Sequence, residues 1–312
     1  MKVNIVMPTY NGARFLVQQI ESIQDQTYTD WNLLIRDDGS TDETIDIIKR
    51  FVEQDSRIKY INPNDQRNLG VIDSFYTLVK YSQADFYFFS DQDDIWLPKK
   101  LEICLKEAKK HDNSRPIMYY TDLKVVDEQL NIISESMIKS QSHHANTTLL
   151  AELTENTVTG GVSMANDALI ELWQDTDDVI MHDWYLALLA ASMGELVFIN
   201  QPTELYRQHD NNVLGARTWQ KRLKQWAKPS QPFAKYWSLI RASQKQARKL
   251  LSYKLNEENR QLVENFVDIT NQNFVSKVLT VKKYNFRKNR AFHTFIFRSL
   301  IITNFAHKLG DK

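Results

Sequence analysis

The sequence is poor in cysteine and in long apolar runs, and each absence limits what the protein can be. Cys104 is the only cysteine among 312 residues, so no intrachain disulfide can form, and we expect it to be buried and inert. No run of about eighteen apolar residues occurs, so no membrane-spanning helix is expected. The apolar start at 2–7 is too short for a signal segment and is interrupted at Pro8. These features together are typical of a cytoplasmic protein.

The sequence also lacks net charge, but this balance hides an asymmetry. Residues 1–215 carry 18 Lys and Arg against 34 Asp and Glu, whereas residues 216–312 carry 21 against 5. We therefore expect an acidic catalytic domain at 1–215 and a basic, aromatic-rich helical region at 216–312, with a boundary near Gly215. An acidic domain can still bind a nucleotide diphosphate where a metal ion neutralises the phosphates.

Short apolar runs alternate with helical periodicities in the first third of the sequence. This alternation predicts right-handed crossovers in a mostly parallel central sheet flanked by helices, a Rossmann-like α/β fold. Ser40 and Glu43 are expected to form a capping box for the second helix, and Pro98 to occupy the first position of the fourth. The expected strands are 3–7, 31–36, 58–61 and 86–89. The expected helices are 13–26, one that includes 45–52, 71–81 and 98–111.

Acidic or turn residues follow three of these strands, at 8–11, 37–38 and 91–94. Because the carboxyl ends of parallel strands share one edge of a sheet, these segments predict one composite pocket. The first turn has neither G-x-G-x-x-G nor a P-loop lysine, which excludes those two phosphate cradles. Three close carboxylates repel one another unless a cation compensates, which predicts a Mg²⁺ or Mn²⁺ site that holds a diphosphate. The dipole of the following helix would explain one such Asp, but not three.

Three motifs in order carry a specific resemblance. They are Pro-Thr-Tyr-Asn-Gly at 8–12, Asp-Asp-Gly-Ser-Thr-Asp at 37–42 and Asp-Gln-Asp-Asp-Ile-Trp-Leu-Pro-Lys-Lys-Leu at 91–101. Together they resemble glycosyltransferase family 2, whose members are inverting enzymes of the GT-A fold. The resemblance covers residues 1–215. Within the family, the chain is most similar to bacterial rhamnosyltransferases that build streptococcal rhamnose-rich cell-wall polysaccharide.

By this resemblance, donor-binding roles belong to the strand-end motifs and to the loop at 62–70. Tyr10 packs near the nucleotide base, and Asp38 accepts a hydrogen bond from the base N3–H, which suits a carboxylate. Asp91 lies near the ribose, and Asp93 is the principal metal ligand with Asp94 in support. The other donor-side residues are Pro8, Arg67, Asn68 and Gly70.

Two alternatives stay open on the donor side. Asp37 and Asp38 also suit a role as caps of their own turn. Arg67, which could touch the nucleotide, equally suits a solvated loop arginine.

The acceptor-side residues come from the middle of the sequence. Gly160 and Gly161 let the backbone approach a sugar. In the family, an acid at the start of the next helix is the general base, a role that belongs here to Asp183, with Trp184 beside it. Where the family often has Glu-Asp, this chain has His182-Asp183, so His182 either orients the acceptor or caps the helix. Asp183 also suits an ordinary first-turn helix acid.

Two further residues follow an expected strand at 195–200. The resemblance implies that His209 contacts the metal or the diphosphate, and Arg207 could hold a phosphate through its planar fork. A lone histidine is otherwise more often structural. Loops within 139–178 are expected to select the sugar.

The basic region is expected to be helical, with aromatic and basic residues interleaved. Such helices suit the surface of an anionic membrane, where a lipid-linked acceptor would be presented. Helix–helix packing, or a subunit interface in a homo-oligomer, is an open alternative. No nucleic-acid-binding motif accompanies the pattern, so nucleic acid is not an expected partner. The residues concerned are Trp219, Lys221, Arg222, Lys224, Trp226, Lys228, Phe233, Lys235, Tyr236 and Trp237, and then Phe286, Arg287, Lys288, Arg290, Phe292, Phe295, Phe297, Arg298 and Leu300.

The function expected from the motifs and the resemblance is metal-dependent, inverting transfer of L-rhamnose from dTDP-L-rhamnose to a lipid-linked saccharide. The enzyme would be peripheral on the inner face of the plasma membrane. Two alternatives remain: a family 2 transferase that uses a UDP-hexose for another surface polysaccharide, and a nucleotide-sugar-binding subunit without turnover.

Overall fold

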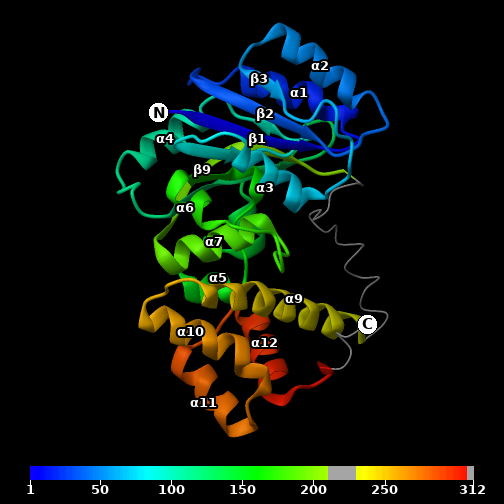
Figure 1. Ribbon diagram of the computed structural model, residues 1–312. Helices are drawn as coiled ribbons and strands as arrows, with labels where there is room; N and C mark the ends of the chain where they lie inside the picture. Colours follow the sequence, from blue (N-terminus) through cyan, green and yellow to red (C-terminus); the bar gives the residue numbers. More distant parts are fainter. Residues whose placement is uncertain (210–229, 308–312) are drawn as a thin grey trace.

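The computed structural model describes residues 1–209 and 230–307. In Figure 1, a sheet with helices on both sides occupies one end of the molecule, and helices from the last quarter of the chain occupy the other. Several sequence-based expectations lie outside the described residues, namely those for Gly215, Trp219, Lys221, Arg222, Lys224, Trp226 and Lys228.

The strands of residues 1–209 form one sheet. In sheet order they are β3 (Ile58–Tyr60), β2 (Trp31–Asp37), β1 (Val3–Thr9), β4 (Phe86–Phe89), β8 (Ser163–Asn166), β6 (Ile117–Val126), β9 (Glu195–Arg207) and β5 (Ile95–Trp96), while β7 (Ile132–Ser134) pairs with β6. β1, β2, β3 and β4 pair in parallel, as the alternating pattern predicted. Beyond β4 the sheet is mixed, because β8 runs antiparallel to β4 and β6, and β9 runs parallel to β6.

Helices cover both faces of this sheet. They are α1 (Ala13–Gln24), α2 (Thr44–Gln54) and α4 (Lys100–Ala108) on one face, and α3 (Val71–Tyr81), α6 (Asp167–Leu172) and α7 (His182–Met193) on the other. Side chains of β1 alternate between the two cores, since Ile5 and Met7 pack with α1 whereas Val6 packs with α3. Cys104 on α4 is buried, as expected. The flanked α/β sheet is therefore confirmed.

The start of α2 differs from the prediction. The helix begins at Thr44, and Glu43 before it makes no side-chain cap, so the capping box of Ser40 and Glu43 is wrong. Asp42 accepts the Thr44 N–H at 3.0 Å instead. The reason is that the Ser40 hydroxyl is used in the turn after β2, where it donates to Asp37 at 2.6 Å.

The segment around Pro98 also differs. α4 begins at Lys100, and Pro98 lies in the turn before it, where the Lys100 N–H donates to the Leu97 carbonyl at 3.0 Å. The turn is needed because the two residues of β5 pair antiparallel with β9. β9 in turn extends to Arg207, seven residues beyond the predicted strand, and so brings its end to the acidic turn after β4.

The last quarter of the chain is helical, as predicted, and shares a core with the α7 face of the sheet. Trp237, Phe266 and Leu300 belong to the same buried cluster as Leu186 of α7. No helix of residues 1–209 and 230–307 has the length and apolarity to cross a membrane. The helices are α9 (Ser230–Lys249), α10 (Glu257–Asp268), α11 (Phe274–Tyr284) and α12 (Ala291–Thr303), and α5 (Leu149–Thr154) contacts α9. Short turns of helix lie at Ile138–Ser142, Gly160–Val162, Leu250–Ser252 and Ile269–Asn271.

Candidate active site

The ends of β1 and β4 are joined by one glutamine. The Tyr10 N–H donates to Gln92 Oε1 at 2.9 Å, and Gln92 Nε2 donates to the Tyr10 carbonyl at 3.0 Å. A Cβ on Gly12 would lie 2.2 Å from Gln92 Oε1, so any larger residue there would displace the Gln92 amide that joins the two strand ends. The Tyr10 side chain stays half exposed beside this junction, and Pro8 is half-buried in β1. The sequence motifs contain Gln92 and Gly12, but their spacing alone did not reveal this contact.

The two acids after β2 have different partners. Asp37 is buried and accepts hydrogen bonds from the Ser40 N–H and hydroxyl, which makes it the cap of its turn. Asp38 is also buried and pairs with Arg36 Nη1 at 2.5 Å. It accepts the N–H of Leu69 at 2.7 Å and the N–H of Gly70 at 2.8 Å. Asp38 therefore fixes the loop before α3 in place.

The loop after β3 places its polar residues toward solvent. The Arg67 side chain is 76% exposed and pairs with Asp65 at 2.7 Å, which is the solvated arrangement left open by the sequence. Asn68 is exposed as well. Gly70 precedes α3 with a φ of 82°, a backbone conformation that favours glycine.

The acidic turn after β4 gathers carboxylates that repel one another. Burial raises the pKa of Asp91 to about 8, with further contributions from the charges of Asp93, Glu204 and Asp183. Burial, followed by Glu204, also raises the pKa of Asp94 well above its usual value. Raised carboxyl pKa values of this kind are common at functional sites.

Asp93 and His209 meet at this turn, as the sequence-based hypothesis required. His209 Nε2 lies 2.7 Å from Asp93 Oδ2. Asp94 uses Oδ1 to accept the Arg207 N–H at 2.9 Å, while its buried Oδ2 has no hydrogen-bond partner among the described residues. An imidazole nitrogen and carboxylate oxygens this close together suit one divalent cation of the Mn²⁺ class. Residues 1–209 and 230–307 contain no group of three or more His, Cys, Asp or Glu side chains placed to hold a metal ion.

Arg207 supports the turn from within the protein. Its side chain is buried, with Nε donating to the Asp93 carbonyl at 3.0 Å. Nη2 donates to Gln18 Oε1 at 2.7 Å, and the guanidinium stacks on Phe15 at 4.5 Å. This arrangement positions Asp93, a supporting role that differs from the phosphate contact considered from the sequence.

A buried ion pair lies beneath the acidic turn and was not anticipated. Lys100 Nζ is 2.6 Å from Glu204 Oε2, and both side chains are fully buried. Lys100 also donates to the Gly161 carbonyl, which joins α4, β9 and the Gly160–Val162 turn. A Cβ on Gly161 would lie 2.6 Å from Glu204 Oε1 and 3.3 Å from Asp91 Oδ2. The backbone at Gly161 thus passes directly over the acids, which only glycine permits.

Asp183 lies in the first turn of α7, facing the same acids. Burial raises its pKa to about 6, and its Oδ1 accepts the Trp184 N–H at 2.7 Å. Trp184 Nε1 donates to the Glu152 carbonyl on α5 at 2.8 Å. Glu152 is fully buried, its Oε2 has no partner in the described chain, and burial raises its pKa to about 8.

His182 does not cap the helix, and its side chain is buried. The residue before α7 is Met181, which makes no side-chain cap, so the capping hypothesis for His182 is wrong. Its ring packs against Phe75 with centroids 4.1 Å apart, and burial lowers its pKa to about 3. A Cβ on Gly160 would lie 3.0 Å from His182 Nε2, so the ring supports this turn.

The start of α7 is held by the helical region. Gln246 of α9 is fully buried, and its Oε1 accepts the N–H of Ile180 at 2.7 Å and of Met181 at 2.8 Å. These two N–H groups immediately precede the residue pair that contains Asp183. No local pattern around Gln246 indicated this contact.

Comparisons with known proteins match this architecture. The family model described as glycosyl transferase family 2 matches residues 4–165. The dTDP-rhamnosyl transferase RfbG of Shigella flexneri is 29% identical over 219 residues, which cover 67% of this chain and 74% of that protein. The UDP-Glc:alpha-D-GlcNAc-diphosphoundecaprenol beta-1,3-glucosyltransferase WfgD of Escherichia coli is 37% identical over 112 residues, covering 36% and 43% respectively.

Solved structures agree on the fold. The crystal structure of S. aureus TarS 1-349 in complex with UDP-GlcNAc aligns with a TM-score of 0.60 at 15% identity, covering 99% of this chain and 88% of that one. The mannosyltransferase PcManGT from Pyrobaculum calidifontis, in complex with GDP-Man and Mn²⁺, aligns at 0.56 and 12% identity, covering 99% and 83%. The GT-A-like fold expected from the sequence is thereby confirmed.

Proposed function

This chain belongs to glycosyl transferase family 2, and from that membership we propose that it transfers L-rhamnose from dTDP-L-rhamnose to a lipid-linked saccharide of a cell-surface polysaccharide. The observation that carries the proposal is the site itself, in which the acidic turn with Asp91 and Asp93 faces a buried carboxylate, Asp183. The rhamnosyl donor is supported by the likeness to RfbG. The likeness to WfgD supports the alternative of a UDP-hexose donor.

On the donor side, the chain binds the nucleotide and keeps the acids in place. Tyr10 offers a half-exposed ring to the base, and Asp38 retains acceptor capacity on Oδ2 for the base N3–H. Asp91, in the turn after β4, is assigned to the ribose by the family resemblance. Asp93 and His209 would hold Mn²⁺ or Mg²⁺, which when bound supplies positive charge for the leaving diphosphate.

On the acceptor side, Asp183 acts as the general base. Its carboxylate takes the proton of the acceptor hydroxyl while that oxygen forms a bond to the anomeric carbon. The bond from this carbon to the diphosphate breaks on the opposite face, so one displacement inverts the configuration. The pKa of about 6 suits a base that is ionised at neutral pH. Gly160 and Gly161 are buried beside it, and their missing side chains let the backbone lie close to His182 and Glu204.

A panel of nucleotide sugars tests the function directly. We expect release of dTDP from dTDP-L-rhamnose, in the presence of Mn²⁺ and a lipid-linked saccharide, to exceed release of nucleoside diphosphate from UDP-glucose, UDP-galactose and UDP-N-acetylglucosamine. Release of UDP alone would favour the hexose alternative. Absence of release from every donor, with nucleotide binding intact, would favour the non-catalytic alternative.

The helical region also offers a surface suited to an anionic membrane. One face of α11 exposes Phe274, Val275 and Leu279, each more than half exposed, and α12 exposes Phe295. Residues 269–307 contain seven Lys and Arg and no Asp or Glu. Figure 1 places α11 at the end of the molecule farthest from the sheet. We propose that this apolar face inserts into a bilayer surface, with basic residues beside anionic headgroups.

Vesicle binding tests this surface. We expect Leu279→Glu to weaken binding to phosphatidylglycerol vesicles about tenfold or more, because a charge replaces an inserted apolar side chain. The control is Ile133→Glu, which changes an equally exposed residue on β7. Flotation of the wild type and both variants would measure the effect, and equal binding by all three would reject the surface.

A further inference from the structure

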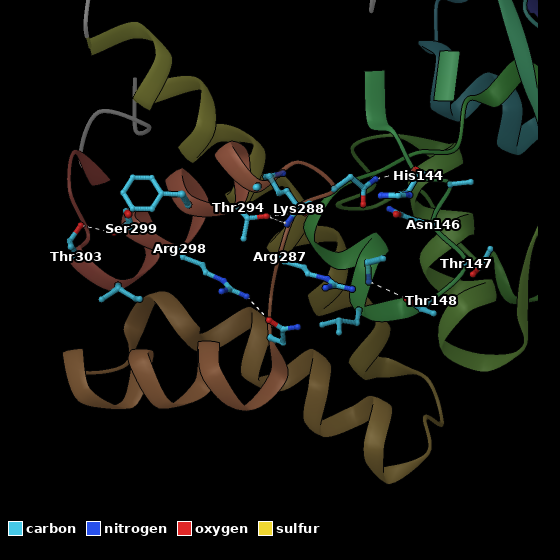
Figure 2. A pocket seen from close by; sticks show the side chains of 18 residues that line it. His144, Asn146, Thr147, Thr148, Arg287, Lys288, Thr294, Arg298, Ser299 and Thr303 are labelled. Atoms are coloured by element: carbon cyan, nitrogen blue, oxygen red, sulfur yellow. Dashed lines mark hydrogen bonds between the residues drawn. The ribbon is translucent and has the colours of Figure 1, made fainter. Parts of the chain in front are cut away.

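A cavity of about 1000 Å³ lies between α5 and the segment 285–303, apart from the acidic turn. One side is formed by residues around the start of α5, including Thr148 and Leu150, and the other by α12 and the loop before it. Figure 2 shows this space with Arg287 directed toward α5, and Arg298 hydrogen-bonds to Asn285. None of these residues belongs to the proposed catalytic site.

The cavity is cationic. Arg287, Lys288 and Arg298 line it, and none of its described lining residues is Asp or Glu. Arg298 donates to neutral acceptors, the Phe286 carbonyl at 2.8 Å and the Asn285 side-chain oxygen at 2.6 Å. These contacts fix the guanidinium without cancelling its charge. An anion that entered would meet positive charges already positioned for it.

Two of the cations are anchored to the end of α5. Lys288 Nζ donates to the Thr154 carbonyl at 2.6 Å, and burial lowers the pKa of its ammonium group, while the charge of Glu155 opposes this shift. The Thr154 hydroxyl donates to the Arg287 carbonyl at 2.6 Å. The Arg287 backbone is therefore fixed while its side chain is exposed. An exposed guanidinium on a fixed backbone suits recognition of phosphate oxygens.

The same cavity has an apolar side. Leu150, Phe295 and Ile302 line it together with the cations, and Phe295 is 69% exposed. Hydroxyl groups of Thr294 and Ser299 lie among them. Positive charge next to exposed apolar surface suits an amphiphile, a molecule that carries phosphate on a hydrocarbon chain.

The cavity and the Asp183 site share α5 as a common wall. Glu152 of α5 is on the side of Asp183, because its carbonyl accepts from Trp184 and the charge of Asp183 contributes to its raised pKa. Leu150 and Ala151 of the same helix line the cavity. A helix is about 10 Å across, so the two sites are about one helix width apart.

We infer that this cavity binds the phosphate or diphosphate group of the lipid-linked acceptor, an inference that rests on the proposed transferase function. The cations contact the phosphate oxygens, and Leu150, Phe295 and Ile302 contact the first part of the lipid chain. The saccharide then extends around α5 to present its hydroxyl to Asp183. The cavity would thus select acceptors by the phosphate or diphosphate group that links the saccharide to its lipid chain.

Binding of farnesyl diphosphate, measured by titration calorimetry in EDTA, tests the inference without turnover and without metal at the acidic turn. We expect Arg287→Ala to weaken binding about tenfold, because a charge-assisted contact to phosphate is lost. Lys282→Ala on α11 is the control, since it removes the same charge outside the cavity lining and should bind as the wild type does. In turnover assays, Arg287→Ala should raise the acceptor KM and leave kcat and the donor KM unchanged.

Phosphatidylglycerol vesicles distinguish binding of the acceptor's phosphate from binding of the phosphate in a membrane lipid headgroup. If the acceptor is the ligand, Arg287→Ala and Lys282→Ala lower vesicle binding equally. Unchanged farnesyl diphosphate binding in Arg287→Ala would overturn the inference, and so would a loss confined to vesicle binding. Intact farnesyl diphosphate binding by a protein that transfers no sugar would count against the proposed function and leave the phosphate site standing.

Discussion

Replacing Asp183 with Asn is expected to lower turnover about 10²–10⁴-fold, the usual contribution of a general base, while donor binding is unchanged. The amide has nearly the same shape and can still accept the Trp184 N–H. It cannot take a proton from the acceptor hydroxyl. Steady-state release of nucleoside diphosphate would measure turnover, and calorimetric titration with dTDP and Mn²⁺ would measure binding.

The pH profile gives this prediction a second readout. The wild-type kcat should rise as pH increases through about 6, because the proposed base must be in its carboxylate form. The acids that face it are Asp91 and Glu152, and the neighbouring His182 has a lowered pKa. The variant should lack this rise. Asp46→Asn, an exposed first-turn acid of α2, is the matched control and should behave as the wild type does. Retained turnover in Asp183→Asn would assign the base elsewhere.

Stability should move in the opposite direction to activity. Since burial raises the pKa of Asp183 from 3.8 to about 6, the folded state holds the proton more tightly than the unfolded state. The carboxyl therefore favours folding most below pH 3.8, and this contribution is lost as pH rises through about 6. Keeping it ionised at pH 7 costs about 3 kcal/mol, so Asp183→Asn is expected to be no less stable than the wild type.

Replacing Asp93 with Asn is expected to abolish metal-dependent nucleotide binding and, with it, transfer. Loss of even an outer partner of a metal ligand weakens binding about 10–100-fold, so loss of a ligand should exceed about 100-fold. The fold should persist, because Asn can still accept a hydrogen bond from His209 and its backbone carbonyl still accepts from Arg207.

Calorimetric titration with dTDP, in Mn²⁺ and in EDTA, would separate the two contributions to binding. Asp93→Asn should give the same weak binding in both, while Asp30→Asn, an exposed acid before β2, should keep the Mn²⁺-dependent gain. A Mn²⁺-dependent gain in Asp93→Asn equal to that of the wild type would remove Asp93 from the metal site.

Local sequence patterns were sufficient to predict most of the fold and the grouping of the strand-end segments on the proposed donor side. Strands, helices and strand-end acids have short-range signatures, and parallel pairing then brings 8–12, 37–42 and 91–94 to one edge. The contact between Asp93 and His209 was predictable only through the family resemblance, because 116 residues separate them in sequence.

Contacts set by burial were not predictable from sequence. Lys100 and Glu204 form a fully buried pair across 104 residues, yet each looks in sequence like an ordinary charged residue. Arg207 was considered for phosphate because arginine suits phosphate, but its donors are taken by Gln18 and by backbone carbonyls. Whether a charged side chain is buried depends on how segments that are distant in sequence pack together. The residues next to it in the sequence do not reveal this.

The Gln246 contact changes how the two halves of the chain can be separated. Because this side chain of α9 accepts the N–H groups of Ile180 and Met181, the helical region supports the start of the helix that carries the proposed base. A protein truncated before α9 would leave two amides unsatisfied next to the proposed base, and Leu186 of the shared core would lose neighbours. The helical region is therefore not a transplantable module. A chimera with another family member would need the α5 and α7 surfaces to be exchanged together with it.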